Sequence, residues 1–120
     1  MWTDKYLGIP YATLNCGELV KKVLAEEFQF LADIPTGKGK SSVTQELQIR
    51  RSLSELCNVT HAPRDGDVVL MRQYGRTGHV GIFARISNIP WVLHTTEKSG
   101  SVLQPVYQLD LVVEDYYTWR

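Results

Sequence analysis

The stretch TLNCGELVKKVL, Thr13–Leu24, contains a cysteine at the point where a helix is expected to begin. Asn15 is a favoured N-cap residue, and Glu18, three positions later, completes the pattern of a capping box. Apolar residues then recur at helical spacing at positions Leu19, Val20, Val23, Leu24 and Phe28. The pattern predicts a helix that begins at Cys16 and ends near Phe30.

A cysteine at the first position of a helix has two interpretations. The unpaired backbone N–H groups and the positive end of the helix dipole favour thiolate over thiol, which makes such a cysteine nucleophilic. Alternatively, Cys16 is a small apolar filler of the core, since free cysteines are among the most buried residues. This stretch alone leaves both interpretations open.

The length and charge of the chain exclude several classes of protein. Its 120 residues suffice for a single domain, 1–120, that buries a core without disulfides or metals. The 13 basic and 13 acidic side chains cancel, so the basic surface of a nucleic-acid-binding protein is not expected. Two cysteines, Cys16 and Cys57, are too few for a disulfide framework, and we expect both to be reduced.

The apolar segments of the chain are short. None approaches the roughly 20 residues that span a bilayer. The first residues, MWTDKYLGIPY, lack the apolar stretch of a signal peptide. We therefore expect no membrane insertion, no export signal and synthesis in the cytoplasm.

Beyond the first helix, the chain divides into a helical and a strand-rich part. The segment 41–57, SSVTQELQIRRSLSELC, predicts a second helix whose inward face carries Val43, Leu47, Leu53 and Leu56. Glycine and proline in 33–42 predict a loop before it. Apolar patterns then predict strands within 63–72, 79–86, 91–96, 101–109 and 111–120. This order favours an α+β domain with N-terminal helices packed on an antiparallel sheet.

Two histidines lie on neighbouring predicted strands. His79 begins the strand HVGIFARI after the polar loop RQYGRTG, and His94 lies on the following strand. A two-residue turn at Ser87 and Asn88 would put both on one face of the sheet, about 7–8 Å apart. A four-residue turn would keep them on this face at a greater distance, so the sequence predicts the shared face and leaves the register open. With Cys16 they would supply a thiol nucleophile, a general base and a group that orients the base. The alternative is a pair of half-buried sheet histidines without a chemical role.

A zinc site is the rival interpretation of the cysteine and histidine content. Cys57 and His61 are four residues apart and would share a face if they lay on a helix. However, the sequence CNVTHAP resembles a helix end, and no CxxC or HExxH spacing is present. We therefore expect neither a metal nor another cofactor.

Three ordered pieces of the sequence resemble a known family of enzymes. They are YLGIPYATLNCGELVKKVL (6–24), DGDVVLMRQYGRTGHVGIF (65–83) and WVLHTTEKSGSV (91–102). Together they resemble the NlpC family of papain-like cysteine peptidases, which cut peptidoglycan stem peptides. The similarity covers most of the chain and leaves out mainly 33–62.

The resemblance implies a papain-like fold and a role for each matching residue. Cys16 would be the nucleophile, His79 the general base and His94 the residue that orients His79. The backbone N–H of Cys16 and the hydroxyl of Tyr11 would stabilise the oxyanion. The implied reaction is acyl transfer to the thiol and hydrolysis of the thioester, at a γ-D-glutamyl–diamino acid bond of peptidoglycan peptides.

The chain departs from the family pattern around the cysteine. Asn15 stands where the family usually has an acidic residue, and Gly17-Glu18 follows in place of Ser-Gly or Trp-Gly. A Glu18 carboxylate that pointed inward would oppose thiolate formation. The glycine-rich turn before the cysteine is shortened to ATLN, which leaves the shape of the substrate groove and the cleaved bond open.

The loop RQYGRTG beside the expected base contains the candidate substrate ligands Arg72, Tyr74 and Arg76. Stem peptides carry free carboxylates, and a guanidinium group is suited to bind them. The alternative is that these side chains are only solvated.

The short length and the sequence GDVVLMR are most similar to compact family members found among phage tail genes. This similarity implies association with the virion, phage tail proteins as partners and action in the cell wall after delivery by a larger assembly or release at lysis. Two other functions stay open: a structural or assembly component of a phage tail with little or no activity, and an amidase or acyltransferase on the same fold.

Overall fold

The structure is a computed structural model that describes residues 1–36, 42–73 and 76–120, with the backbone alone at 42, 43, 73, 76 and 77. The elements are η1 (Asp4–Tyr6), α1 (Cys16–Glu27), α2 (Ser42–Leu56), β1 (Cys57–Thr60), β2 (Val68–Gln73), β3 (Arg76–Ile86), β4 (Ile89–Thr96), β5 (Gly100–Pro105), η2 (Val106–Gln108) and β6 (Val112–Trp119). Within these ranges, two α-helices accompany a six-stranded antiparallel sheet of order β1-β6-β2-β3-β4-β5. The predicted α+β class is confirmed.

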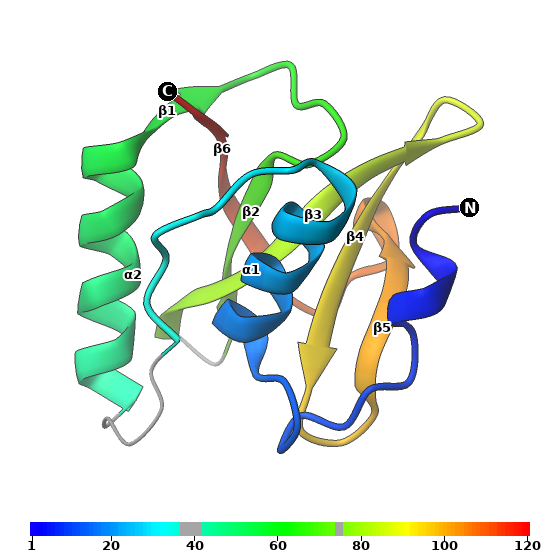
Figure 1. Ribbon diagram of the computed structural model, residues 1–120, viewed down its shortest axis with the longest axis horizontal. Helices are drawn as coiled ribbons and strands as arrows, with labels where there is room; N and C mark the ends of the chain where they lie inside the picture. The colour runs from blue at the N-terminus through cyan, green and yellow to red at the C-terminus, as the bar shows by residue number, and fades with distance from the viewer. Residues whose placement is uncertain (37–41, 74–75) are drawn as a thin grey trace.

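Helix α1 begins at Cys16, as the capping pattern predicts. The Asn15 side chain accepts a hydrogen bond from the Glu18 N–H at 3.0 Å, and the Glu18 carboxylate accepts one from the Asn15 N–H at 3.2 Å. The helix ends at Glu27 rather than near Phe30, because Gln29 adopts a left-handed backbone conformation with φ of 50°. Its apolar stripe is buried against β3 and β4 and lies across the front of the sheet (Figure 1).

Helix α2 turns a different face inward from the one predicted. Ile49 and Leu53 are fully buried, whereas Leu47 is 63% exposed and Leu56 lies at the boundary of exposure. The prediction is therefore wrong for these two leucines, because β3 and β1 contact the stripe that contains Ile49 and Leu53. The side chain of Val43 lies outside the described residues.

The β3–β4 hairpin has the register of the two-residue turn, one of the two that the sequence leaves open. Ser87 and Asn88 form its two-residue turn with φ of 53° and 64°, the left-handed values that a type I′ turn requires. Ile82 pairs with Leu93 and Phe83 with Val92, which are the pairs that a two-residue turn at Ser87 and Asn88 requires. A short loop therefore determines which residues of two strands share a face.

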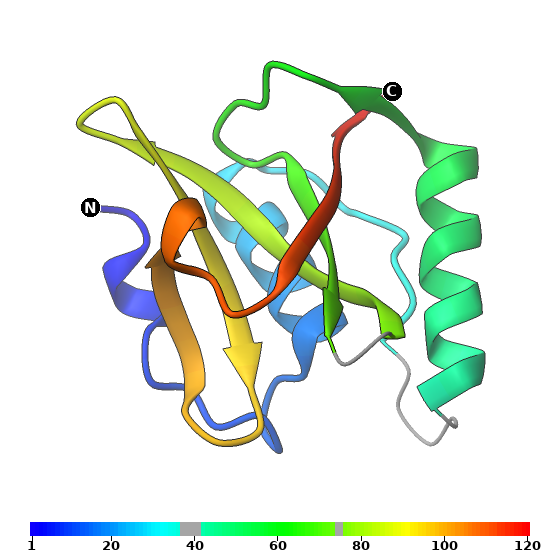
Figure 2. The same ribbon diagram turned by 180° about the vertical axis from the view of Figure 1, so that it is seen from behind.

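Both faces of the sheet are packed. The face toward the helices carries Val68, Leu70, Val80, Ile82 and Leu93. The opposite face carries Val69, Met71, Phe83 and Val92, against apolar residues of 106–116. Figure 2 shows the connection that contains η2 crossing this second face between β5 and β6.

The N-terminal segment extends the sheet beyond its edge strand. Ser101 on β5 donates its N–H to the Ile9 carbonyl at 2.9 Å and accepts from the Gly8 N–H at 2.8 Å. These bonds hold the 8–15 segment beside the β4–β5 turn. The start of α1, this turn and the start of β3 consequently lie at one end of the molecule (Figure 1).

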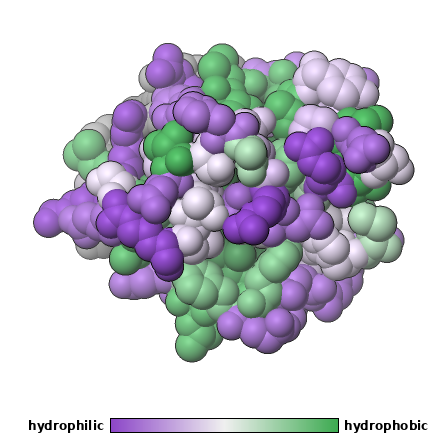
Figure 3. All heavy atoms as spheres, turned by 90° about the horizontal axis from the view of Figure 1, so that it is seen from above, coloured by the Kyte–Doolittle hydropathy of each residue, from purple (hydrophilic) through white to green (hydrophobic). Residues whose placement is uncertain are grey.

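The opposite end of the molecule has a mixed surface. Figure 3 shows hydrophilic and hydrophobic residues alternating over that face in small groups.

Neither α1 nor α2, nor any other helix in the described ranges, combines the length and apolar character needed to cross a membrane.

Candidate active site

Cys16 lies at the start of α1 against the beginning of β3. Its side chain is 3% exposed. The backbone N–H groups of Val80, Gly17 and Cys16 itself lie close enough to its sulfur to act on the pKa of the thiol, and the Gln45 amide of α2 donates a hydrogen bond to the sulfur at 3.9 Å. Because Val80 directly follows His79, the fold brings the cysteine and the predicted base to the same end of one strand.

The two histidines form a hydrogen-bonded pair, as their predicted shared face requires. His79 Nε2 lies 3.0 Å from His94 Nδ1, with ring centroids 5.2 Å apart and ring planes nearly perpendicular. On the far side, His94 Nε2 lies 2.7 Å from Gln104 Oε1 on β5. The three side chains form a row across β3, β4 and β5, which we call the His–His–Gln row.

The row and the thiol approach β3 from different sides. His79 pairs with Met71, and cross-strand partners share a face, so His79 faces away from α1. Val80 faces the helix, and its N–H meets the Cys16 sulfur near the plane of the sheet. In the part of the chain that the structure describes, no hydrogen bond joins Sγ to either imidazole. Among the described residues, the resting site thus has the thiol and the base at one end of β3 without a hydrogen bond between them.

Burial determines the protonation of the cysteine. The surrounding N–H groups lower the pKa of the Cys16 thiol, as a helix start predicts, but burial outweighs them and the Glu18 charge adds to it. The net direction is upward, opposite to the expected thiolate stabilisation. Burial also raises the pKa of Cys57, to about 11. Both cysteines are therefore neutral thiols in the resting protein, and neither forms a disulfide.

Both imidazoles are neutral near pH 7. Burial lowers the pKa of His79 to about 4, and repulsion from the protonated form of His94 makes a smaller contribution. Burial also lowers the pKa of His94, although its hydrogen bond with Gln104 acts in the opposite direction. A neutral His79 retains a ring lone pair over a wide pH range, which a general base needs.

The low pKa of His79 makes the stability of the protein pH-dependent. The unfolded chain binds a proton at this histidine near pH 6.5 and the folded protein only near pH 4. The free energy of unfolding should therefore fall by about 3 kcal/mol as the pH drops through this window. Urea titrations of the wild type and His79→Gln measure this contribution, because the substitution removes it and leaves the carboxyl groups unchanged. Equal losses of stability in the two proteins would contradict the assignment.

Tyr11 lies beside the cysteine. Burial raises the pKa of its hydroxyl, and the negative charges of Glu97, of Glu18 and of Cys16 when it is a thiolate add to the effect. An open groove of about 480 Å³ runs between the 8–12 segment and the turn at 97–100, with Tyr11 in its lining. The placement is compatible with an oxyanion role for the hydroxyl, which stays a prediction.

The candidate substrate ligands are only partly described. Arg72, at the end of β2, forms a 2.9 Å ion pair with Glu114, whose other carboxylate oxygen lies 3.9 Å from Arg50. The Arg72 guanidinium is half-exposed and already paired with the Glu114 carboxylate. Tyr74 and the side chain of Arg76 lie outside the described residues.

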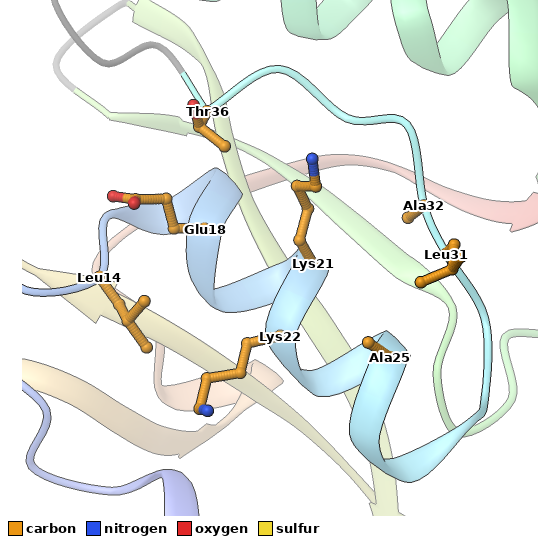
Figure 4. Close-up of a pocket in the computed structure, with 8 residues that line it drawn as sticks. All are labelled: Leu14, Glu18, Lys21, Lys22, Ala25, Leu31, Ala32 and Thr36. Atoms are coloured by element: carbon orange, nitrogen blue, oxygen red, sulfur yellow. The ribbon is translucent and has the colours of Figure 1, made fainter.

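A second cavity lies on the outer side of α1. It has a volume of about 500 Å³ and a mainly apolar lining. Figure 4 shows Glu18 and Thr36 near the start of the helix and Lys21 and Lys22 further along it. Because Cys16 is buried on the side of α1 that faces the sheet, this cavity does not contain the reacting groups.

The alternative zinc site would need Cys57 and His61 on one helix, and they do not lie on one. Cys57 begins strand β1 instead of continuing a helix, and His61 follows the end of that strand. The two side chains therefore do not share the helix face that their spacing would require.

No protein-family model matches the chain, and no curated protein matches it. The geometry of the site joins His79 to His94 and places Tyr11 near Cys16. It also adds Gln104 and Gln45, which the sequence analysis missed because single glutamines carry no motif.

Proposed function

We propose that this protein is a papain-like thiol hydrolase of the NlpC type that cuts peptidoglycan stem peptides. The observation that supports the proposal is the His–His–Gln row at the same end of β3 as a cysteine that begins a helix. A nucleophile, a base and a group that orients the base are the parts required for acyl transfer through a thiol.

In the proposed reaction, Cys16 Sγ attacks the carbonyl carbon of the scissile amide and its proton passes to His79. The oxyanion forms beside the backbone N–H groups of the helix start and the Tyr11 hydroxyl. The C–N bond then breaks, and the leaving amine takes the proton from His79. Water then attacks the thioester carbonyl carbon as His79 takes a proton from it. The C–S bond breaks and the sulfur takes this proton from His79, which releases the carboxylic acid and regenerates the free thiol.

The resting geometry requires one adjustment before this reaction. Sγ and the His79 imidazole have to come into hydrogen-bonding contact, and catalytic hydrogen bonds commonly tighten only when the substrate is bound. Bound substrate would also keep water from the thiol, and proton transfer to a neutral imidazole can accompany the attack. A raised thiol pKa is therefore compatible with the mechanism.

The choice of a wall peptide rests on the resemblance of the three sequence pieces to the NlpC family and on the groove beside Tyr11. That groove presents both signs of charge, from Glu97 and Lys98. Stem peptides carry free carboxylates, which Lys98 can bind, and free amines, which Glu97 can bind. The similarity of the sequence GDVVLMR to compact family members found among phage tail genes leads us to propose a phage tail as the setting and the bacterial wall as the place of action.

A second candidate function is a structural component of a phage tail with little activity. The burial of Cys16 and the absence of a described hydrogen bond from its sulfur to an imidazole favour it. A transferase on the same scaffold would need an acceptor amine in place of water, so added amines would appear in its products.

Purified stem peptides test the proposed hydrolysis. We expect the wild-type protein to split a tripeptide that contains γ-D-glutamyl–diamino acid into two fragments whose masses sum to the substrate plus one water, as read by mass spectrometry. The same peptide with an α-glutamyl linkage is the matched control and should stay intact. Uncut γ-linked peptides of both the lysine and the diaminopimelate type would refute the hydrolase proposal and favour the structural one.

A further inference from the structure

The His–His–Gln row contains one side chain that no sequence pattern indicated. Gln104 is half-buried on β5, where its backbone pairs with Val92. Its Oε1 is 2.7 Å from Nε2 of His94, and His94 is 1% exposed. The second ring nitrogen of His94 meets His79. Both nitrogens of this buried ring thus have a protein partner.

These contacts determine where the ring protons lie. A carbonyl oxygen only accepts hydrogen bonds, so the proton of neutral His94 lies on Nε2 and its Nδ1 is an acceptor. Nδ1 of His94 must then receive the Nε2–H of His79 at 3.0 Å. A neutral His79 with its proton on Nε2 has its lone pair on Nδ1.

We infer that Gln104 is a positioning residue whose amide oxygen sets the tautomers of both histidines and makes Nδ1 of His79 the basic nitrogen of the site. The inference about the tautomers follows from the row itself. Its catalytic meaning rests on the proposed function, since only a base that accepts the thiol proton needs a defined lone pair.

The reverse arrangement shows why the orientation of the Gln104 amide matters. If its NH2 group faced His94 in place of the oxygen, it would donate to Nε2, and the His94 proton would lie on Nδ1, which would point at Nε2 of His79. The His79 proton would then occupy Nδ1, and the ring would offer no lone pair away from His94. The end of this amide that faces His94 therefore sets the direction of both hydrogen bonds in the row.

Ring nitrogen NMR tests the inference without any substrate. In ¹⁵N-histidine-labelled wild-type protein near pH 7, we expect a protonated Nε2 and an unprotonated Nδ1 on both His79 and His94. Gln104→Leu should shift both rings toward mixed or reversed tautomers, whereas Gln104→Glu, which keeps an acceptor, should retain the wild-type pattern. The exposed Gln108 provides the matched control Gln108→Leu.

A wild-type His79 that carries its proton on Nδ1, or a folded Gln104→Leu variant with unchanged tautomers, would overturn the inference. If Gln104→Leu does not fold, the wild-type and Gln104→Glu spectra still test the tautomer assignment. A proton on Nδ1 of His79 in either protein would overturn it. In an active protein, Gln104→Leu should lower kcat by at least about 10-fold with little change in KM, since a wrong tautomer impairs the base rather than binding. An unchanged kcat would overturn the catalytic part. If the protein shows the expected tautomers but does not cut stem peptides, the missing activity contradicts the proposed function. The tautomer assignment would still stand.

Discussion

Cys16→Ala is expected to lower kcat/KM for stem-peptide cleavage by at least about 10⁴-fold, because it removes the atom that forms the covalent bond to the substrate. The remaining groups can bind and polarise the peptide, but they cannot form a thioester. Initial rates of fragment release, measured by mass spectrometry at matched concentrations of folded protein, give the ratio.

Cys57→Ala is the matched control for this substitution. Cys57 is also a buried, reduced cysteine, but it lies at the start of β1 rather than at the start of α1. Its truncation should cost about 1–2 kcal/mol of stability through the lost packing and leave the rate per folded molecule unchanged. A Cys16→Ala protein that retains more than about one hundredth of the wild-type rate would exclude a thiol mechanism.

Phe83→Ala should reduce the free energy of unfolding by about 3–5 kcal/mol, the largest effect that we expect on stability. The Phe83 side chain is fully buried on the second face of the sheet. Its ring meets that of Tyr116 edge to face at 5.6 Å, and the Arg85 guanidinium lies 5.4 Å from its centroid. Alanine would leave a cavity between β3 and the connection that crosses this face.

Urea denaturation followed by circular dichroism measures the effect of Phe83→Ala. Phe83→Leu, which keeps most of the buried volume, should cost less than about 1.5 kcal/mol and is the matched control. A loss below about 1 kcal/mol for the alanine variant would mean that the second face is not a packed core. That face also holds His79 and His94, so the outcome bears on the rigidity of the His–His–Gln row.

Two features of the fold are encoded over short stretches, and the sequence predicts the first and leaves two alternatives for the second. The start of α1 depends on Asn15 and Glu18, which bond each other's backbone within one turn. The register of β3 and β4 depends on the turn at Ser87 and Asn88. Each involves neighbours in the chain, whose geometry is fixed by covalent distance and side-chain chemistry.

The features that the sequence analysis missed depend on contacts between distant segments. The inward stripe of α2 contains Ile49 because β3 and β1 lie against that side. Helical spacing alone allows several stripes, and packing selects among them.

In the candidate site, too, some features depend on local sequence and others on contacts between distant segments. Sequence alone identified the candidate residues, namely a cysteine at a helix start and two histidines on one sheet face. Only the tertiary structure decided that Cys16 and His79 approach β3 from different sides, that burial keeps the thiol neutral, and that Gln104 completes the row. The reason is that burial and hydrogen-bond partners depend on how segments pack together in space, as α1 packs against β3 and β4, and a local sequence pattern does not state this packing.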